Sequence, residues 1–481
     1  MTQPRPTDSS LAAASHRGRR LAWFGAVVLG VVSTWFWFSS PWPSLSLNTF
    51  AVAICVLGVV PTLLWLHRDD QSYPLPEILQ ITMVPFYAVP IFSEHKAIMS
   101  YSEDVLTNAV LLVAVFQASA FAGSFASSKG YFRRVARTFW HTEFVGEDSL
   151  RFTTYTMVST SLWLLFTSLT DVVPSEYYGA FRAIFFGIGT LSNFVQARMW
   201  GAGQLSNAQK NLFVANIIVQ VLLQNLSLLL VTSIITILLT IVGFFSSARR
   251  IPWLVCLASL AVFGVLHNGK HQMRKVYWEQ NPHRLTLVEL PAFYSEWVGY
   301  GLAASGADEE ASPGTETQAN IFQRASLIQI VAYAVDTVPV PTPYLNGATY
   351  ALIPPQVLPR FLWPDKPSPN DSVKILSVRL GVLSEEQAET TSIAYGLIAE
   401  SYVNFGFPGT AILGFLLGWA LRRAALVTSD CSALSIGGIF RILCLAWCLN
   451  TETTLAVWLS SFYQACVAIF VPLFFLQSFF K

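Results

Sequence analysis

Apolar segments long enough to cross a membrane recur along this chain, separated for the most part by short polar connections. A spanning helix needs about 20 consecutive, mostly apolar residues. We therefore predict an all-α polytopic membrane protein with about twelve spans. The spans are predicted near residues 21–40, 46–66, 78–96, 104–125, 152–170, 180–197, 211–227, 229–246, 251–267, 394–420, 433–450 and 455–479.

The lysines and arginines between these segments predict the orientation of the chain, because cytoplasmic loops carry an excess of both. With twelve spans the basic connections at 129–137, 249–250 and 422–423 fall on one side, together with both chain ends. Residues 1–20 are then a cytoplasmic tail. The segment 211–246 is too long for one span and short for two, and a single crossing there would reverse every later loop.

Helix-breaking residues mark two of the predicted spans. Pro76, Pro85 and Pro90 punctuate the third, which favours an irregular or re-entrant segment. In the tenth, Gly406 and Gly409 predict a kink or close helix packing.

Between the ninth and tenth spans the apolar pattern stops, and residues 268–392 are predicted to form one large extracytoplasmic domain. This domain separates a bundle of about nine spans at residues 21–267 from about three C-terminal spans at residues 393–481. Within it, residues 324–335 have helical apolar spacing but are too short to span, which fits a helix lying at the membrane interface.

The segment LPRFLWPDKP, residues 358–367, places charged side chains among three prolines and two aromatic residues. Proline fixes φ and disfavours helix in the residue before it, so this path is stiff and extended. Trp363 suits the headgroup level of a membrane. We expect the segment to hold Arg360 and Lys366 at phosphate depth, with Asp365 orienting a base or capping a turn.

Basic residues elsewhere in the insert extend this pattern. Lys270 and Arg274 lie four apart, on one helical face if the ninth helix continues, and Arg324 opens the amphipathic stretch. Arginine supplies a planar fork of donors and lysine a point charge, which are the groups that a diphosphate requires. Each residue also has a simpler interpretation, since lysines and arginines at helix ends commonly extend to lipid headgroups.

Two further residues are candidate proton acceptors. Glu400 lies inside the tenth predicted span, where an ionisable residue is energetically costly and indicates a function. We interpret it either as a general base or as the partner of a buried arginine. His271 is a second candidate base, although its spacing from His267 and His283 matches no zinc-binding pattern.

Composition narrows the class of protein. The chain of 481 residues is 53% hydrophobic and only 12% charged, which is too apolar for a soluble protein. Its net charge of +1 gives no reason to expect a nucleic-acid partner. All six cysteines lie in or beside apolar segments, so neither a disulfide framework nor a metal site is indicated, and we expect no metal and no cofactor.

Taken in order, several segments of the C-terminal half resemble the Wzy-type O-antigen and exopolysaccharide polymerases, the membrane oligosaccharide repeat-unit polymerases. The N-terminal spans match that family in hydropathy only. The segments are GKHQMRKVYW (269–278), RASLIQIVAY (324–333), YLNGATY (344–350), LPRFLWPDKP (358–367) and AESYVNFGFPG (399–409).

The resemblance implies a bundle similar to that of GT-C glycosyltransferases, located in the bacterial inner membrane. Such enzymes move a glycan from one undecaprenyl diphosphate carrier to the sugar end of another lipid-linked repeat unit, without a metal. It implies that the basic residues bind the diphosphate, that Glu400 or His271 accepts the hydroxyl proton, and that aromatic residues stack on sugars. The basic residues are Lys270, Arg274, Arg324, Arg360 and Lys366, and the aromatic residues are Tyr344, Tyr350 and Trp363.

Three other functions remain open at this stage. An O-antigen-type ligase would share the architecture and the arginines. A polysaccharide transporter or flippase is a second alternative, although inverted repeats with broken helices are not recognisable in the sequence. An envelope scaffold is a third. For the polymerase we expect the lipid-linked oligosaccharide, membrane lipids and a chain-length regulator of the export system as partners.

Overall fold

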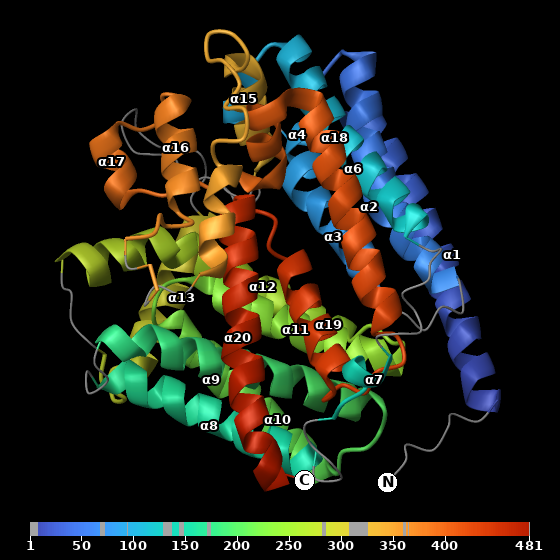
Figure 1. Cartoon of the computed structure of the whole chain (residues 1–481), viewed down its shortest axis with the longest axis vertical. Helices are drawn as coiled ribbons and strands as arrows, with labels where there is room; N and C mark the ends of the chain where they lie inside the picture. The colour runs from blue at the N-terminus through green and yellow to red at the C-terminus, as the bar shows by residue number, and fades with distance from the viewer. Residues whose placement is uncertain are drawn as a thin grey trace. The chain divides into compact units, whose positions relative to one another are not determined.

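The computed structural model describes residues 8–67, 73–93, 95–127, 137–143, 149–170, 175–280, 285–306, 326–358, 362–363 and 365–480. Within these residues the regular structure is helical (Figure 1), apart from one isolated β-bridge between Glu143 and Ser435. The chain divides into two compact units. Unit 1 comprises residues 1–142, 325–432 and 436–466, and unit 2 comprises residues 143–324, 433–435 and 467–481.

Eight helices of the described residues are long and apolar enough to cross a membrane, judged by length and composition. This result confirms the prediction of an all-helical chain and fits a polytopic membrane protein. Each of the eight coincides with one of the twelve predicted spans. They are Gly18–Ser39, Leu45–His67, Leu75–Phe92, Glu103–Ala126, Leu230–Ala248, Trp253–Trp278, Gly396–Val427 and Leu455–Phe475.

The other four predicted spans also fall on helices, α8, α9, α10 and α19, which do not qualify as candidate spans. The helix α19 has only 13 residues, and α10 is rich in asparagine and glutamine. The count of about twelve crossings therefore stays a prediction. So does the side of the membrane on which residues 268–392 lie, and the boundary between the two units falls inside that stretch.

Unit 1 brings the first third of the chain together with the region around α18. The helices α2, α3 and α6 pack beside one another, and both α3 and α6 pack against α18 (Figure 1). Its elements are α1 (Asp8–Ser39), α2 (Leu45–His67), α3 (Leu75–Met83), η1 (Val84–Ala88), α4 (Val89–Phe92), α5 (Lys96–Met99), α6 (Glu103–Ala126), α7 (Arg137–Trp140), α15 (Ile328–Thr337), η4 (Tyr350–Leu352), η5 (Pro354–Val357), α16 (Asp371–Arg379), α17 (Glu385–Thr390), α18 (Gly396–Val427), α19 (Ile436–Cys448) and the first turns of α20 (Leu455–Phe480).

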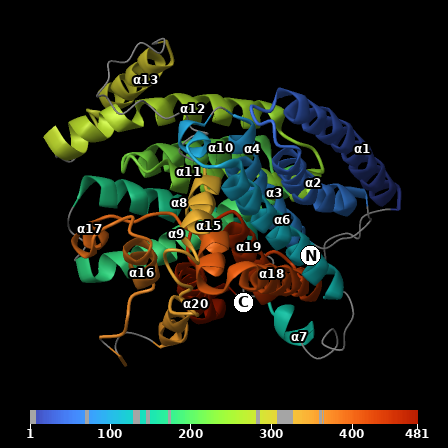
Figure 2. The ribbon, with the colours of Figure 1, turned by 90° about the horizontal axis from the view of Figure 1, so that it is seen from above.

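Unit 2 is made of consecutive helices that pack both on their neighbours in the chain and on helices two positions away. Its elements are α8 (Ser149–Leu169), α9 (Ser175–Gly201), α10 (Asn207–Asn225), α11 (Leu230–Ala248), α12 (Trp253–Arg274), η3 (Lys275–Gln280), α13 (Leu290–Gly306) and the last turns of α20. Figure 2 shows α8 to α11 as a layer of long helices, in which α9 contacts both α8 and α11.

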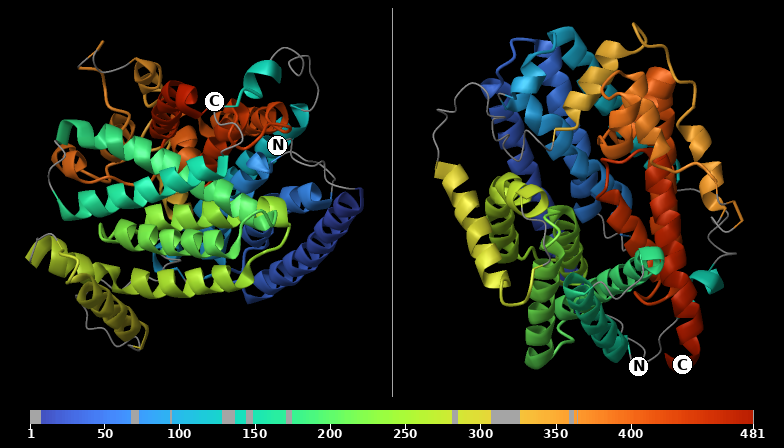
Figure 3. Two further views of the ribbon diagram at one scale, coloured as in Figure 1. Left: turned by 90° about the horizontal axis from the view of Figure 1, so that it is seen from below. Right: turned by 90° about the vertical axis from the view of Figure 1, so that its left-hand side faces the viewer.

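The helix α13 folds back onto α12 within unit 2 (Figure 3). Glycines permit the close approach: a Cβ added at Gly269 would lie 2.6 Å from the carbonyl oxygen of Trp297. The indole nitrogen of the buried Trp297 donates to the carbonyl of Leu266 at 2.7 Å. The helical course of the ninth predicted span therefore continues past residue 267, which is the condition under which Lys270 and Arg274 share a helical face.

The helix-breaking residues act where the sequence predicts. In the third predicted span, Val84–Ala88 is a π-helical segment between α3 and α4, so the helix is irregular but continuous. The segment 211–246 forms two helices, α10 and α11, joined through Leu228, whose φ is +52°. Only α11 is long and apolar enough to qualify as a candidate span, so the number of crossings in this segment stays a prediction.

Helices α6 and α18 pack with their backbones almost in contact because glycines face the partner helix. A Cβ added at Gly414 would lie 2.5 Å from the carbonyl oxygen of Phe116, and one at Gly418 would overlap the carbonyl of Ala120. From the other side, a Cβ at Gly123 would overlap the carbonyl of Phe415. Gly414 and Gly418 form a G-x-x-x-G pattern, which is typical of close helix pairs in membranes.

Substitution of Gly418 tests this packing. We expect Gly418→Val to force the two helices apart and lower the free energy of unfolding by about 1–3 kcal/mol, the usual range for overpacking. The measurement is thermal unfolding of the purified protein in detergent. Gly30→Ala in α1 is the matched control, since nothing lies within 4 Å of its added Cβ. Equal melting temperatures for wild type and Gly418→Val would contradict the packing described.

Candidate functional site

Helix α18 is kinked near its start, and the kink creates free backbone acceptors. Gly406 has φ +66° and ψ −157°, and two residues later Pro408 has no N–H to donate to the carbonyl of Asn404. A loop from unit 1 takes the place of the missing helical partners. The N–H of Leu345 donates to the carbonyl of Val403 at 3.0 Å, and the N–H of Asn346 donates to the carbonyl of Asn404 at 3.1 Å.

The side chain of Asn404 holds the same loop a second time. Its Oδ1 accepts from the N–H of Gly347 at 3.0 Å, and its Nδ2 donates to the hydroxyl of Thr349 at 2.9 Å. Both Asn404 and Thr349 are fully buried. Gly347 has φ +90°, a conformation that favours glycine. The segment 345–349 is therefore fixed on the kinked part of α18.

Glu400 lies one helical turn before Asn404 and is completely buried. Its Oε2 accepts from the N–H of Leu455, the first residue of α20, at 2.6 Å. The start of a helix carries unpaired N–H groups and a partial positive charge, which stabilise a carboxylate there. The Thr349 hydroxyl also interacts with the carboxylate. No donor among the described residues is in full hydrogen-bond position to the second oxygen, Oε1.

Tyr350 follows directly on this loop and lies close enough to Glu400 to interact electrostatically. Burial, and to a smaller extent the Glu400 carboxylate, raises the pKa of Tyr350 well above its usual value, so its hydroxyl remains protonated at neutral pH. Its Oη is buried and has no hydrogen-bond partner in the described part of the chain. A phenol donor and a carboxylate acceptor with unused capacity are suited to bind a hydroxyl group, which needs one of each.

The structure thus brings together two of the residues predicted from sequence, Glu400 and Tyr350. It gives Glu400 a helix N-terminus as its partner. Within the described residues no arginine lies within ion-pair distance of Glu400, so the alternative interpretation, that it pairs with a buried arginine, finds no support there.

Lys366 holds the proline-rich turn of its own segment. Its Nζ donates to the carbonyl of Leu358 at 2.6 Å and lies 3.5 Å from the carbonyl oxygens of Pro355 and Gln356. These contacts leave the ammonium group less capacity for a phosphate. The neighbouring Asp365 and Trp363 are exposed, and the roles of all three in substrate binding stay predictions.

The other predicted basic residues that the structure describes lie in unit 2. Arg274 stacks on Trp278, with 4.4 Å between its Cζ and the ring centroid, and donates to the carbonyl of Leu228 at 3.0 Å. Lys270 is half-buried and His271 is exposed on the same helix. Arg324 and Arg360 lie outside the described residues, so their predicted contacts with a diphosphate stay predictions.

Sequence reasoning missed a fully buried arginine in α19. Arg441 donates through Nη1 to the carbonyls of Thr428 at 2.5 Å and Ser429 at 3.3 Å, where α18 ends. Its guanidinium also lies 3.8 Å from the ring centroid of Tyr73. A cation at a helix C-terminus complements the partial negative charge there. These contacts assign Arg441 a structural role, which its position in an apolar run did not reveal.

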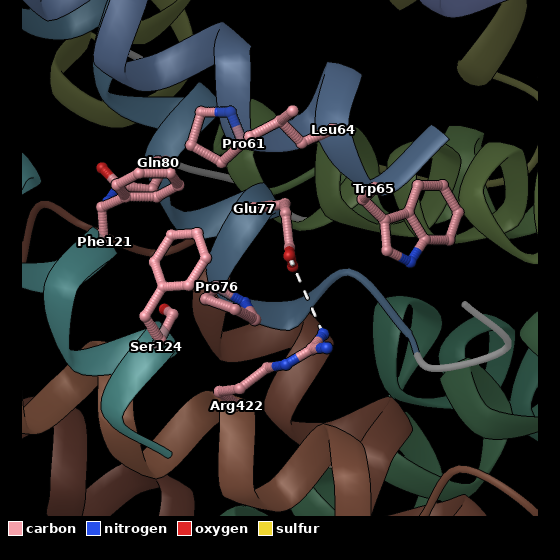
Figure 4. A pocket seen from close by; sticks show the side chains of 10 residues that line it. Pro61, Leu64, Trp65, Pro76, Glu77, Gln80, Phe121, Ser124 and Arg422 are labelled. Carbon is pink, nitrogen blue, oxygen red and sulfur yellow. Dashed lines mark ion pairs between the residues drawn. The ribbon is translucent and has the colours of Figure 1, made fainter. Parts of the chain in front are cut away.

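A second missed feature is an ion pair beside a small cavity of about 60 Å³ in unit 1. Figure 4 shows Glu77 of α3 and Arg422 of α18 facing each other, 4.0 Å apart. Their side chains are 12% and 13% exposed, so the pair is largely shielded from water. The cavity has room for a few water molecules. Glu77 and Arg422 are 345 positions apart in sequence, so no spacing pattern could have paired them.

The loop on α18 can be tested through Asn404. We expect Asn404→Ala to release residues 345–349, because it removes one acceptor and one donor from a buried network, and to lower stability by about 1–3 kcal/mol. Hydrogen exchange of the Gly347 amide and thermal unfolding measure the two effects. Asn370→Ala, at an exposed asparagine with no capping hydrogen bond from its side chain, is the control. Unchanged protection of the Gly347 amide in Asn404→Ala would show that the Asn404 side chain does not hold residues 345–349 on α18.

The ion pair beside the cavity predicts non-additive effects. We expect Glu77→Gln and Arg422→Met each to destabilise the protein, because each leaves a shielded charge without this partner. The double variant should be more stable than the sum of the single effects predicts, by about 1 kcal/mol or more. Thermal unfolding of the four proteins measures this coupling, and strictly additive losses would show that the two side chains do not interact.

Comparison with known proteins gives no match for this chain among protein families, curated proteins or solved structures. The function is therefore argued from the residues of the chain itself.

Proposed function

We propose that the protein is a membrane glycosyltransferase that polymerises lipid-linked oligosaccharide repeat units, using a lipid diphosphate as the leaving group. In this proposal the reaction takes place at the extracytoplasmic end of α18. The observation that carries it is the pair formed by Glu400 and Tyr350, a buried carboxylate in a candidate span beside a protonated phenol, each with unused hydrogen-bonding capacity.

The energetic position of Glu400 supports a role beyond packing. An ionisable side chain inside a membrane span is costly and commonly marks a functional site. The helix N-terminus at Leu455 satisfies one carboxylate oxygen, which a glutamine would do equally well through its amide oxygen. Unlike the amide of a glutamine, a carboxylate can also accept a proton at its second oxygen. We therefore assign Glu400 as the general base that deprotonates the acceptor sugar hydroxyl.

The proposed step conserves atoms and charge. The acceptor hydroxyl oxygen forms a bond to the anomeric carbon of the donor glycan, while the bond from that carbon to the carrier diphosphate breaks. The hydroxyl proton passes to Glu400, and the diphosphate leaves with the bonding electron pair. Because charge develops on the diphosphate, arginines that neutralise it contribute most to the rate, and from the family resemblance we assign this part to Arg360.

Access to the base requires movement of the loop at 345–349. Glu400 is fully buried, and Thr349 and Tyr350 of the adjoining loop lie against it. We propose that substrate binding displaces this loop and that its hydrogen bonds to α18 close the site again, which excludes water from the glycosyl donor.

A complementation experiment tests the function. The gene is deleted in its native host, and surface polysaccharide is analysed by gel after complementation with wild type, Glu400→Gln or Arg360→Ala. We expect the deletion to leave single repeat units and the wild type to restore long chains. Both variants should lose at least about 100-fold in polymer, Glu400→Gln because it lacks the general base and Arg360→Ala because it no longer neutralises the leaving diphosphate. Membrane abundance of each variant is measured by immunoblot.

The outcomes separate the alternatives. If the deletion strain still builds long polymer on the lipid carrier but does not transfer it to the final acceptor, the protein is a ligase and not a polymerase. Full restoration of long chains by Glu400→Gln would show that Glu400 is not the general base and contributes only its structural contact with α20. In that case Glu400→Leu, which removes the contact with Leu455, should still lower the abundance of the protein.

A further inference from the structure

Unit 2 contains a cavity of about 360 Å³ that none of the sites above uses. It is lined from α8, α9, α10, α11, η3 and α13, and its volume falls in the range of roughly 300–1,000 Å³ that is usual for small-molecule sites. Leu228, Phe293 and Tyr277 on its wall belong to, or pack against, the buried apolar cluster of this unit, so the wall is supported from behind. The shape of the cavity is therefore maintained by the packed core of unit 2.

One guanidinium lines this cavity. Arg182, in the third turn of α9, is exposed, and among the described residues no carboxylate lies within ion-pair distance of it. An arginine in this setting presents its full fork of donors to a ligand. Phosphate and carboxylate groups match that fork in geometry and charge.

Aromatic rings and hydrogen-bonding side chains complete the lining. Trp278 is 49% exposed, and Arg274 covers its ring while being anchored on the carbonyl of Leu228, so the indole is held in a fixed orientation. Trp163 of α8 is likewise held by stacking on Phe185, with 4.7 Å between ring centroids. Fixed rings bind a flat apolar face at little entropic cost. The hydroxyls of Thr167, Ser227 and Thr232 donate to nearby backbone carbonyls, so their oxygens can serve a ligand hydroxyl only as acceptors.

The cavity lies at the ends of candidate membrane spans. Leu229 and Thr232 on its wall mark the start of the span Leu230–Ala248, and Trp278 is the last residue of the span Trp253–Trp278. Tryptophan at a span end is typical of the headgroup region. In the predicted twelve-span topology this end is extracytoplasmic, and a phosphate bound there would lie at headgroup depth with its lipid chain in the bilayer.

We infer that this cavity binds the head of a lipid-linked glycan, with the phosphate on Arg182 and the first sugar ring against Trp278. The inference rests on the proposed function, since it identifies a binding site within unit 2 for one of the two lipid-linked substrates of that reaction. The shared chemistry is a membrane-bound phosphate that carries a polyol, which ordinary phosphatidylglycerol also offers, so the test has to distinguish the two.

Native mass spectrometry of the full-length protein in detergent tests the site. The probes are undecaprenyl diphosphate with one hexose, undecaprenyl diphosphate alone and phosphatidylglycerol. We expect Arg182→Gln to weaken binding of both undecaprenyl probes at least about tenfold, the loss of one charge-assisted contact. Trp278→Leu should weaken only the probe that carries a sugar. Arg182→Lys, which keeps the charge, should bind within a few-fold of wild type.

Arg198→Gln is the matched control, because Arg198 lies at the other end of α9 and does not line the cavity. Wild-type affinity in Arg182→Gln would overturn the inference, and so would displacement of the glycan probe by an equal concentration of phosphatidylglycerol. Either result would leave the proposed function standing if wild type still restores long polysaccharide chains. A wild type that binds neither undecaprenyl probe would contradict both proposals.

Discussion

The structure of unit 1 depends on how a carboxyl group is accommodated inside α18, a candidate membrane span. Glu400 has no access to water, and one of its carboxyl oxygens accepts from the N–H of Leu455 at the start of α20. Arg441 is the counterpart at the other end of α18, where its guanidinium meets the last carbonyls of that helix. Each of these two buried ionisable groups therefore lies at a helix terminus whose partial charge is opposite to that of its ionised form. This arrangement fixes the ends of α18 in place.

Between those two ends, the kink at Gly406 and the glycines at 414 and 418 have complementary effects. The glycines hold the second half of α18 against α6, so the kink can redirect only the first part of the helix, where Glu400 lies. Pro408 removes a backbone donor, and the loop at 345–349 supplies the replacement hydrogen bonds. The rigid pair of α6 and α18 thus supports the first part of α18, and the loop at 345–349 that covers this part is attached by a few hydrogen bonds. Such a region is suited to opening and closing around a substrate.

The sequence predicted the elements of this structure better than their contacts. Long apolar runs predicted the helices, and the prolines near residue 85 and the glycine at 406 predicted irregular backbone, because both effects are local. The hydrogen-bond partners of Glu400 and Lys366 were not predictable, because only folding brings the N–H of residue 455 and the carbonyl of residue 358 next to these side chains. The cavity around Arg182 could not be predicted from the sequence for the same reason, because residues from six helical elements form its wall.

The central claim is that Glu400 acts through its ionisable oxygen and not only through its contact with α20. The most direct measurement uses purified protein in lipid nanodiscs with a defined lipid-linked repeat unit, and follows chain growth together with release of the carrier diphosphate. We expect wild type to extend the chain, and Glu400→Gln to keep the wild-type melting temperature while forming no glycosidic bond. Chain growth by Glu400→Gln at the wild-type rate would contradict the account.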